Sequence, residues 1–196
     1  MIILKSTIEL NNWFIENINE FGENMGFVPT MGALHKGHAS LIEKASRECQ
    51  IVVVSILVNP TQFNEKADLE SYPRDLDNDV IVAEKAGATI LFTPTPKDIY
   101  GGTPYAEPVD YGLITSTFEA LSRQGHFDGV VSVVDKLFLA VKPNRAYFGS
   151  KDLQQLAVVE KMSSERHPKI KIVSCELIRD ENGLALSSRN IRLSDA

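Results

Sequence analysis

The sequence predicts an α/β protein with a doubly wound, Rossmann-like parallel sheet of about five strands. Segments with helical spacing of apolar residues alternate with short β-branched runs along nearly the whole chain. Residues 51–58 are apolar apart from one serine, a pattern typical of a strand buried on both faces of a parallel sheet. Strands separated by helices also imply right-handed crossovers, which place helices on both faces.

The first half of the chain is predicted to hold a helix followed by a strand–helix–strand unit. Apolar residues at helical spacing predict a helix over residues 8–21, and residues 26–28 form the first predicted strand. A second helix is expected over residues 37–49, because its apolar residues share one face. It leads into residues 51–58, the second predicted strand.

The second half repeats the alternation. Three helices and three strands are predicted. They cover residues 75–86 (helix), 89–92 (strand), 128–141 (helix), 146–148 (strand), 153–164 (helix) and 170–178 (strand). The sequence Pro94-Thr95-Pro96 is interpreted only as a turn.

Composition narrows the class of partner. The net charge is −6 and the sequence has no run of Lys and Arg, so we expect no nucleic-acid partner. Cys49 and Cys175 form no metal-binding pattern, and we expect them to be buried apolar residues in a reducing compartment. Neither a signal peptide nor an apolar run long enough to span a bilayer is found. We therefore expect a soluble cytoplasmic protein without a membrane partner.

The segment PTMGALHKGH at residues 29–38 predicts a phosphate-binding turn between a strand and a helix. A helix N-terminus leaves backbone N–H groups unpaired and carries partial positive charge, so it attracts anions. His35 and His38 would add donors, and Gly32 and Gly37 would let the backbone approach a bulky ligand. An isolated histidine pair is more often a cap or a surface feature, but this setting favours function.

Polar clusters follow other strands at the same edge of the predicted sheet. Residues 59–63 follow the second strand, and residues 149–155 follow the fourth. Residues 179–183 and 186–189 follow the fifth. Because open α/β sheets bind ligands outside the carboxyl ends of their strands, we expect these clusters to converge on one site.

The charged members of these clusters suit phosphate. Lys151 would act as a mobile point charge, and Arg189 as a fixed fork of donors. Ser187 and Ser188 would add hydroxyls beside the arginine. Alone, the lysine would be an ordinary surface residue and the serines a helix cap, so the prediction depends on their joint placement.

The neutral members suit a small substrate. Gln62 and Gln155 can orient hydroxyl and carboxyl groups, because each amide both donates and accepts hydrogen bonds. Asp152 either caps the following helix or binds a ribose hydroxyl, and the sequence favours neither alternative. We interpret His126 as part of a structural turn, and residues 72–74 as the signal that starts a helix.

Missing motifs narrow the chemistry further. The sequence contains no Walker A lysine loop, no G-x-G-x-x-G fingerprint and no recognisable Ser-His-Asp or Cys-His arrangement. Phosphate donors without a nucleophile favour adenylyl transfer, in which the substrate itself attacks the α-phosphate of ATP. Such a reaction depends on positioning and charge stabilisation. A histidine with a pKa of about 6.5 could supply a proton or a hydrogen bond near neutrality.

Six segments carry a family resemblance: residues 29–38, 54–63, 72–74, 125–130, 146–155 and 183–190. Together they resemble the pantothenate synthetase (pantoate–β-alanine ligase) family, within the HIGH-signature nucleotidyltransferase superfamily. The H-x-G-H turn alone would indicate only the superfamily. The ordered set covers nearly the whole chain and is specific to the family.

The resemblance implies a reaction in two steps, with Mg²⁺ as cofactor and a homodimeric enzyme. Pantoate and ATP would form pantoyl adenylate and pyrophosphate, and the amine of β-alanine would then displace AMP to give pantothenate. His38 would stand at the position of the proton donor, with His35 beside it on the phosphates. Lys151 and Arg189 would complete the catalytic set.

The resemblance also assigns binding residues. The ATP site would consist of Met31, Gly32, Ala33, Leu34, His35, Lys36, Gly37, His38, Gly149, Ser150, Lys151, Asp152, the Ile178 backbone, Leu186, Ser187, Ser188 and Arg189. Gln62 and Gln155 would hold pantoate, with Gln62 also near β-alanine. The sequence departs from the family pattern at Ser150, Gln124 and Leu186, where glutamate, proline and methionine are common.

Family members continue into a second, smaller domain that closes over the active site. We therefore expect residues 1–186 to form the domain that binds ATP and pantoate. Residues 187–196 would begin the connection to a C-terminal domain that this sequence lacks. Such a chain would bind its ligands weakly and ligate poorly, because a missing lid exposes the adenylate to water.

Two alternatives remain. Another nucleotidyltransferase with the same turn would act on a phosphorylated substrate, but it would need cations where Gln62 and Gln155 stand. The second alternative is a truncated nucleotide-binding domain with little ligase activity.

Overall fold

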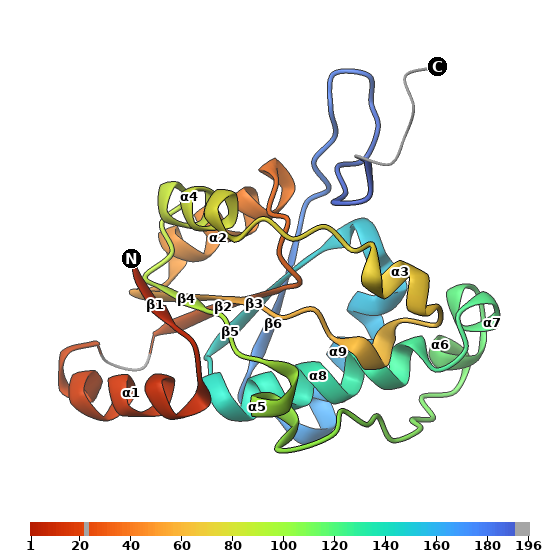
Figure 1. Ribbon diagram of the computed structural model, residues 1–196, viewed down its shortest axis with the longest axis horizontal. Coiled ribbons are helices and arrows are strands. Elements are labelled where there is room, and N and C mark those ends of the chain that lie inside the picture. The colour runs from red at the N-terminus through yellow and green to blue at the C-terminus, as the bar shows by residue number, and fades with distance from the viewer. Residues whose placement is uncertain (22–23, 191–196) are drawn as a thin grey trace.

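The computed structural model describes residues 1–21 and 24–190, and it confirms the predicted parallel α/β architecture. Six parallel strands form one sheet in the order β1-β4-β3-β2-β5-β6 (Figure 1). The strands are β1 (Ile2–Leu4), β2 (Met25–Thr30), β3 (Ile51–Ile56), β4 (Ile90–Phe92), β5 (Arg145–Gly149) and β6 (Lys171–Cys175). The side chains of residues 18–21 lie outside this description.

The sheet has one strand more than the sequence predicts. Strand β1 pairs in parallel with β4 at the sheet edge, where Ile2 lies opposite Ile90. Only Leu4 of its three residues is buried, while Ile2 and Ile3 are exposed. Three residues are too few to show the alternation that marks a strand in a sequence.

The part of the chain that the structure describes contains nine helices. They are α1 (Thr7–Phe21), α2 (Lys36–Glu48), α3 (Lys66–Glu70), α4 (Leu76–Lys85), α5 (Pro96–Tyr100), α6 (Leu113–Ser116), α7 (Glu119–Ser122), α8 (His126–Val141) and α9 (Leu153–Arg166). Two 3-10 turns, η1 (Pro60–Gln62) and η2 (Ser150–Asp152), follow β3 and β5. None of the helices, within residues 1–21 and 24–190, is both long and apolar enough to cross a membrane.

The interpretation of residues 94–96 as only a turn is wrong. Thr95 caps helix α5 through a hydrogen bond from the backbone N–H of Asp98 to its side chain, and Pro96 occupies the first helical turn. Gly101 ends the helix in a left-handed conformation, with φ at 70°. The cap and stop signals were therefore present, but the helix is too short to show a helical period.

The hydrophobic core lies on both faces of the sheet. Helices α2 and α4 cover one face, and α1, α8 and α9 cover the other (Figure 1). Alternate residues of β3 point to opposite faces of the sheet. Val52 and Val54 pack on the face covered by α2, while Ile51 and Val53 pack against α8 and α9. Burial on both faces explains why this strand is apolar along its length.

The strand order determines where a ligand can enter. From β2 the chain adds β3 and β4 on one side, whereas β5 and β6 lie on the other. The crevice between β2 and β5, outside their carboxyl ends, is the switch point at which doubly wound sheets bind ligands.

The predicted division of the chain at residue 186 stays a prediction. Residues 191–196, in the segment expected to begin a connection to a further domain, lie outside the described residues.

Candidate functional site

A cleft of about 270 Å³ opens at the switch point and is lined by most of the predicted site residues. Those that line it are Met31, His35, Gly37, His38, Gln62, Gly149, Lys151, Asp152, Gln155, Ile178, Leu186, Ser187, Ser188 and Arg189. Five residues assigned to the ATP site are not among its lining residues: Gly32, Ala33, Leu34, Lys36 and Ser150. The cleft therefore joins loops that follow β2, β3, β5 and β6.

The two histidines of the turn are held by backbone hydrogen bonds at the start of α2. The N–H of Gly37 donates to Nδ1 of His35 at 3.1 Å, and the N–H of His35 donates to Nδ1 of His38 at 3.3 Å. Their ring centroids lie 4.1 Å apart. Because Nδ1 is an acceptor in both rings, a neutral imidazole must carry its proton on Nε2. Each ring can therefore donate one hydrogen bond from Nε2.

The surroundings of both rings favour the neutral form. Burial lowers the pKa of His38 to about 3, and the neighbouring His35 adds to the effect. Burial and the nearby Lys151 ammonium also lower the pKa of His35. Near neutral pH both residues are therefore hydrogen-bond donors without charge, and neutralisation of a bound anion depends on other groups.

The turn itself is held by a buried carboxylate that sequence analysis missed. Asp79 of α4 accepts hydrogen bonds from the backbone N–H groups of Ala33, at 3.1 Å, and Leu34. Burial raises the pKa of Asp79, and these hydrogen bonds oppose the rise. The turn needs this support because Ala33 has φ at 50°, a conformation that costs free energy in residues other than glycine.

These contacts bear on the anion site predicted at the turn. Of the first N–H groups of α2, that of Gly37 is bonded to His35, and the N–H groups of Ala33, Leu34 and His35 before the helix are also bonded within the protein, so these four are not free to bind an anion. The two imidazoles present Nε2–H in their place, and the partial charge of the α2 N-terminus still favours an anion there.

Gln62 is buried at the wall of the cleft, where neighbouring residues hold its polar groups. Its side-chain oxygen accepts from Nδ2 of Asn59 at 3.1 Å, and its backbone oxygen lies 2.8 Å from Nδ1 of His126. Asn59 lies in the loop that the sequence singled out, and its cap of η1 is a recognisable signal. Nothing in the sequence marks its contact with Gln62.

The interpretation of His126 as part of a turn is wrong. It is the first residue of α8, it is buried, and it lines the cleft. Burial is the main cause that lowers its pKa, so the ring is neutral near neutral pH. Tyr72, interpreted as part of a helix start signal, is also buried and lines the cleft.

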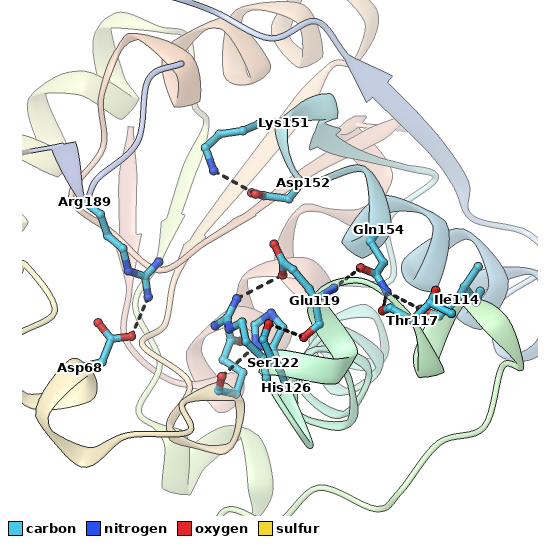
Figure 2. Close-up of polar contacts among 12 residues, drawn as sticks. Asp68, Ile114, Thr117, Glu119, Ser122, His126, Lys151, Asp152, Gln154 and Arg189 are labelled. Carbon is cyan, nitrogen blue, oxygen red and sulfur yellow. Dashed lines mark hydrogen bonds and ion pairs between the residues drawn. The ribbon is translucent and has the colours of Figure 1, made fainter. Parts of the chain in front are cut away.

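Two adjacent glutamines of α9 have different environments. Gln154 accepts from the N–H of Glu119 and donates to the carbonyls of Ile114 and Thr117, which ties α6 and α7 to α9 (Figure 2). Gln155 lines the cleft, and its side chain makes no hydrogen bond to another described residue. Its amide is therefore available to a ligand.

Lys151 and Arg189, the two cations predicted to neutralise phosphate, are each paired with a carboxylate (Figure 2). The Lys151 ammonium lies 2.9 Å from Asp152, whose carboxylate makes no helix-cap hydrogen bond. This geometry disfavours the capping alternative for Asp152. Arg189 binds Asp68 at 2.9 Å and lies over the Tyr72 ring, with its guanidinium carbon 5.5 Å from the ring centroid.

The described residues contain no cluster of three or more His, Cys, Asp or Glu side chains that could hold a metal ion. Mg²⁺ commonly keeps several waters and takes only one or two protein carboxylates together with substrate phosphates. The cleft offers Asp152 and Glu176 for such a role. These donors fit an ion that arrives with a nucleotide rather than a closed protein site.

Comparison with known proteins gives one consistent result. The family model for pantoate-beta-alanine ligase matches residues 2–196. The chain is 50% identical over 173 residues to the pantothenate synthetase of Bacteroides fragilis, covering 88% of this chain and 61% of that protein. It is 47% identical over 193 residues to the enzyme of Porphyromonas gingivalis, covering 98% of this chain and 68% of that protein. The chain thus spans about two thirds or less of these relatives' length.

Solved structures agree with the sequence matches. The pantothenate synthetase of Thermus thermophilus superposes with a TM-score of 0.90 at 42% identity, covering 99% of this chain and 68% of that one. The pantoate-beta-alanine ligase of Francisella tularensis, solved with beta-gamma ATP and beta-alanine, gives 0.91 at 41% identity. That match covers 99% of this chain and 74% of the Francisella chain.

Proposed function

Because this chain belongs to the pantoate-beta-alanine ligase family, we propose that it binds ATP and pantoate and serves the ATP-dependent formation of pantothenate. The observation that supports this function best is the cleft itself. Neutral imidazole donors, the cations Lys151 and Arg189 and two glutamines from loops far apart in the sequence meet there. The Francisella relative was solved with an ATP form and beta-alanine, which supports ATP and beta-alanine as ligands of this chain.

The triphosphate would bind at the α2 end of the cleft. His35 and His38 would each donate from Nε2, and Lys151 and Arg189 would neutralise negative charge. Since the pKa of His38 lies far below neutrality, this residue would act first as a fixed donor and not as a stored proton. Ser187 and Ser188, beside the arginine, would complete the nucleotide site.

Pantoate would bind between the two glutamines that line the cleft. Gln62 and Gln155 carry no charge, which suits a substrate with hydroxyl groups and a single carboxylate. A phosphorylated substrate would need cations in place of these glutamines, and Arg123, which also lines the cleft, is paired with Glu119 at 3.4 Å. This argument favours the ligase over other nucleotidyltransferases that share the H-x-G-H turn.

The proposed reaction needs no nucleophile from the protein. A carboxylate oxygen of pantoate would form a bond to the α-phosphorus of ATP while the bond to pyrophosphate breaks. The amine of β-alanine would then attack the acyl carbon, form the amide, lose a proton and release AMP. The protein's share is to align the reacting groups, to donate hydrogen bonds to the phosphates and to match their charge.

We infer that Mg²⁺ would be held by phosphate oxygens and at most one or two carboxylates, with Asp152 and Glu176 available in the cleft. When bound, the ion would reduce the charge of the triphosphate. The remaining positioning falls to the histidines, the lysine and the arginine.

We also propose a homodimer that acts in the cytoplasm, on the basis of family membership. Sedimentation velocity at several protein concentrations would test the dimer. A single monomeric species at every concentration would contradict it.

The decisive assay follows pyrophosphate and AMP separately. With ATP and pantoate alone, pyrophosphate should be released, and AMP should appear only after β-alanine is added. Release of pyrophosphate with other hydroxy acids but not with pantoate would contradict the proposed substrate. A protein prepared with His38→Ala should lose most of the first step while its melting temperature changes little.

A further inference from the structure

The turn that carries Gln62 is packed directly on the first turn of α8. Gly129 lies at the contact, and a Cβ atom built on it would lie 2.5 Å from the backbone oxygen of Thr61 and 2.6 Å from the nitrogen of Gln62. Only a glycine leaves room for so close an approach. The position of Gln62 is therefore defined by α8 as well as by its own loop.

His126 forms the polar part of this contact. Its Nδ1 lies 2.8 Å from the backbone oxygen of Gln62, and the histidine is only 4% exposed. A carbonyl oxygen can only accept, so Nδ1 must carry the proton and Nε2 must be unprotonated in the neutral ring. This is the opposite tautomer to that of His35 and His38.

Asn59 holds the other polar end of Gln62. Its Nδ2 donates to the Gln62 side-chain oxygen at 3.1 Å and to the backbone oxygen of Gly129 at 3.0 Å. Its Oδ1 accepts from the hydroxyl of Tyr100 at 2.9 Å, which determines the orientation of the Asn59 amide. The Gln62 oxygen is thereby occupied, and the Gln62 NH₂ group is left to donate into the cleft.

We propose that His126 is a positioning residue, which holds the backbone of Gln62 through Nδ1–H so that the Gln62 amide presents its NH₂ donors to an oxygen of the acid substrate. This inference rests on the proposed function, because the acid is taken to be pantoate. His126 acts through Gln62 and needs no contact with the substrate. Its role depends on the donor at Nδ1 and not on the Nε2 atom.

Three variants distinguish the role of Nδ1 of His126 from that of Nε2. In His126→Asn the side-chain NH₂ can occupy the place of Nδ1–H, whereas in His126→Gln the amide reaches the place of Nε2. His126→Leu removes both nitrogens at a similar volume. His167→Asn is the matched control, because His167 lies at the end of α9 and contacts Asp135 outside the cleft.

Isothermal titration with pantoate and with a non-hydrolysable ATP analogue is the test. We expect His126→Leu and His126→Gln to weaken pantoate binding at least about tenfold, while His126→Asn stays within about threefold of the unsubstituted chain. Binding of the ATP analogue and binding by His167→Asn should stay unchanged. The ¹⁵N signals of the imidazoles should also report the Nδ1–H tautomer for His126 and the Nε2–H tautomer for His35 and His38.

Two results would overturn the proposal. One is normal pantoate affinity in His126→Gln together with weakened affinity in His126→Asn, which would assign the role to Nε2. The other is equal pantoate affinity in all three variants. If the melting curve shows that the His126→Leu variant does not fold, the comparison of His126→Asn with His126→Gln still tests whether Nδ1 carries the role. Absence of pantoate binding by the unsubstituted chain, with the ATP analogue bound, would instead contradict the proposed function.

Discussion

At the scale of single residues, the charge state of the two turn histidines is the property that the sequence could not supply. The H-x-G-H pattern predicts that His35 and His38 face a phosphate. Their tautomer and low pKa depend on backbone N–H groups and on burial, which exist only in the folded chain. The pattern thus indicates the ligand, and the structure indicates that the donors are neutral.

The lowered pKa of His38 predicts a dependence of stability on pH. The pKa is about 3 in the folded chain and 6.5 in the reference state, so below 6.5 the unfolded chain binds a proton that the folded chain does not. Stability should therefore be full above pH 6.5 and fall as the pH is lowered, by up to about 1.4 kcal/mol per pH unit for this group. Urea unfolding between about pH 7 and about pH 5 measures the slope. His38→Asn should have a shallower slope, and an identical slope would contradict the assignment.

Substitution of Asp79 should affect both the stability of the turn and the binding of a nucleotide. In Asp79→Asn one acceptor becomes an NH₂ group that faces a backbone N–H, so the turn loses a hydrogen bond and gains a repulsion. We expect a loss of about 1–3 kcal/mol in the free energy of unfolding and weaker binding of an ATP analogue. The matched control is Asp77→Asn, an exposed position on the same helix. Equal stability of the two variants would remove Asp79 from this role.

Substitution of Gln154 and of Gln155 by alanine should have opposite effects on stability and on pantoate binding. Gln155→Ala should weaken pantoate binding about tenfold and change stability by less than about 0.5 kcal/mol, since its amide has no partner among the described residues. Gln154→Ala should lower stability by about 1 kcal/mol because the contacts with Glu119, Ile114 and Thr117 are lost. Calorimetric titration and chemical unfolding of both variants check this pair. A reversed pattern would exchange the two roles.

At the scale of elements, long periodic segments could be predicted and short ones could not. Helices α2, α8 and α9 and the buried strand β3 follow the predicted segments closely, because each has several apolar residues at one period. Strand β1 and helices α3, α6 and α7 have three to five residues each and show no period. Tertiary packing, and not local propensity, decides whether such short segments form.

The close contact between α8 and η1 predicts that a methyl group added at Gly129 will lower stability and weaken pantoate binding. In Gly129→Ala the added Cβ would meet the backbone of Thr61 at 2.5 Å, so η1 must shift. We expect a loss of about 1–3 kcal/mol in stability, together with weaker pantoate binding. Gly102→Ala is the control, since a Cβ there has no neighbour within 4 Å. Unchanged pantoate affinity in Gly129→Ala would show that Gln62 does not depend on this packing.

At the scale of the whole molecule, strand order brings the site together. The sequence predicts that loops after parallel strands converge, and the cleft between β2 and β5 contains most of the predicted residues. It does not predict Asp79 or His126 as parts of the site, because their roles depend on contacts with residues more than forty positions away. Motifs identify residues that face a ligand better than residues that hold them.

Because the cleft takes walls from both halves of the sheet, a ligand bound there should stabilise the whole fold. At a concentration near one hundred times its dissociation constant, an ATP analogue should add about 2.7 kcal/mol to the free energy of unfolding. Adenosine at the same concentration should add much less, since the phosphate donors are the polar groups that converge. Thermal unfolding with each ligand measures the difference. Equal stabilisation by both would contradict a phosphate-binding cleft.

The carboxylate partners of Lys151 and Arg189 bear on selectivity among anions in a cell. An incoming anion must take each cation from a neighbour that already satisfies it, so a small monovalent ion such as chloride gains little by entering. A polyphosphate can replace both partnerships at once and adds the two imidazole donors. On the proposed function, the two ion pairs would therefore favour a highly charged anion such as a nucleotide triphosphate over simple monovalent salts.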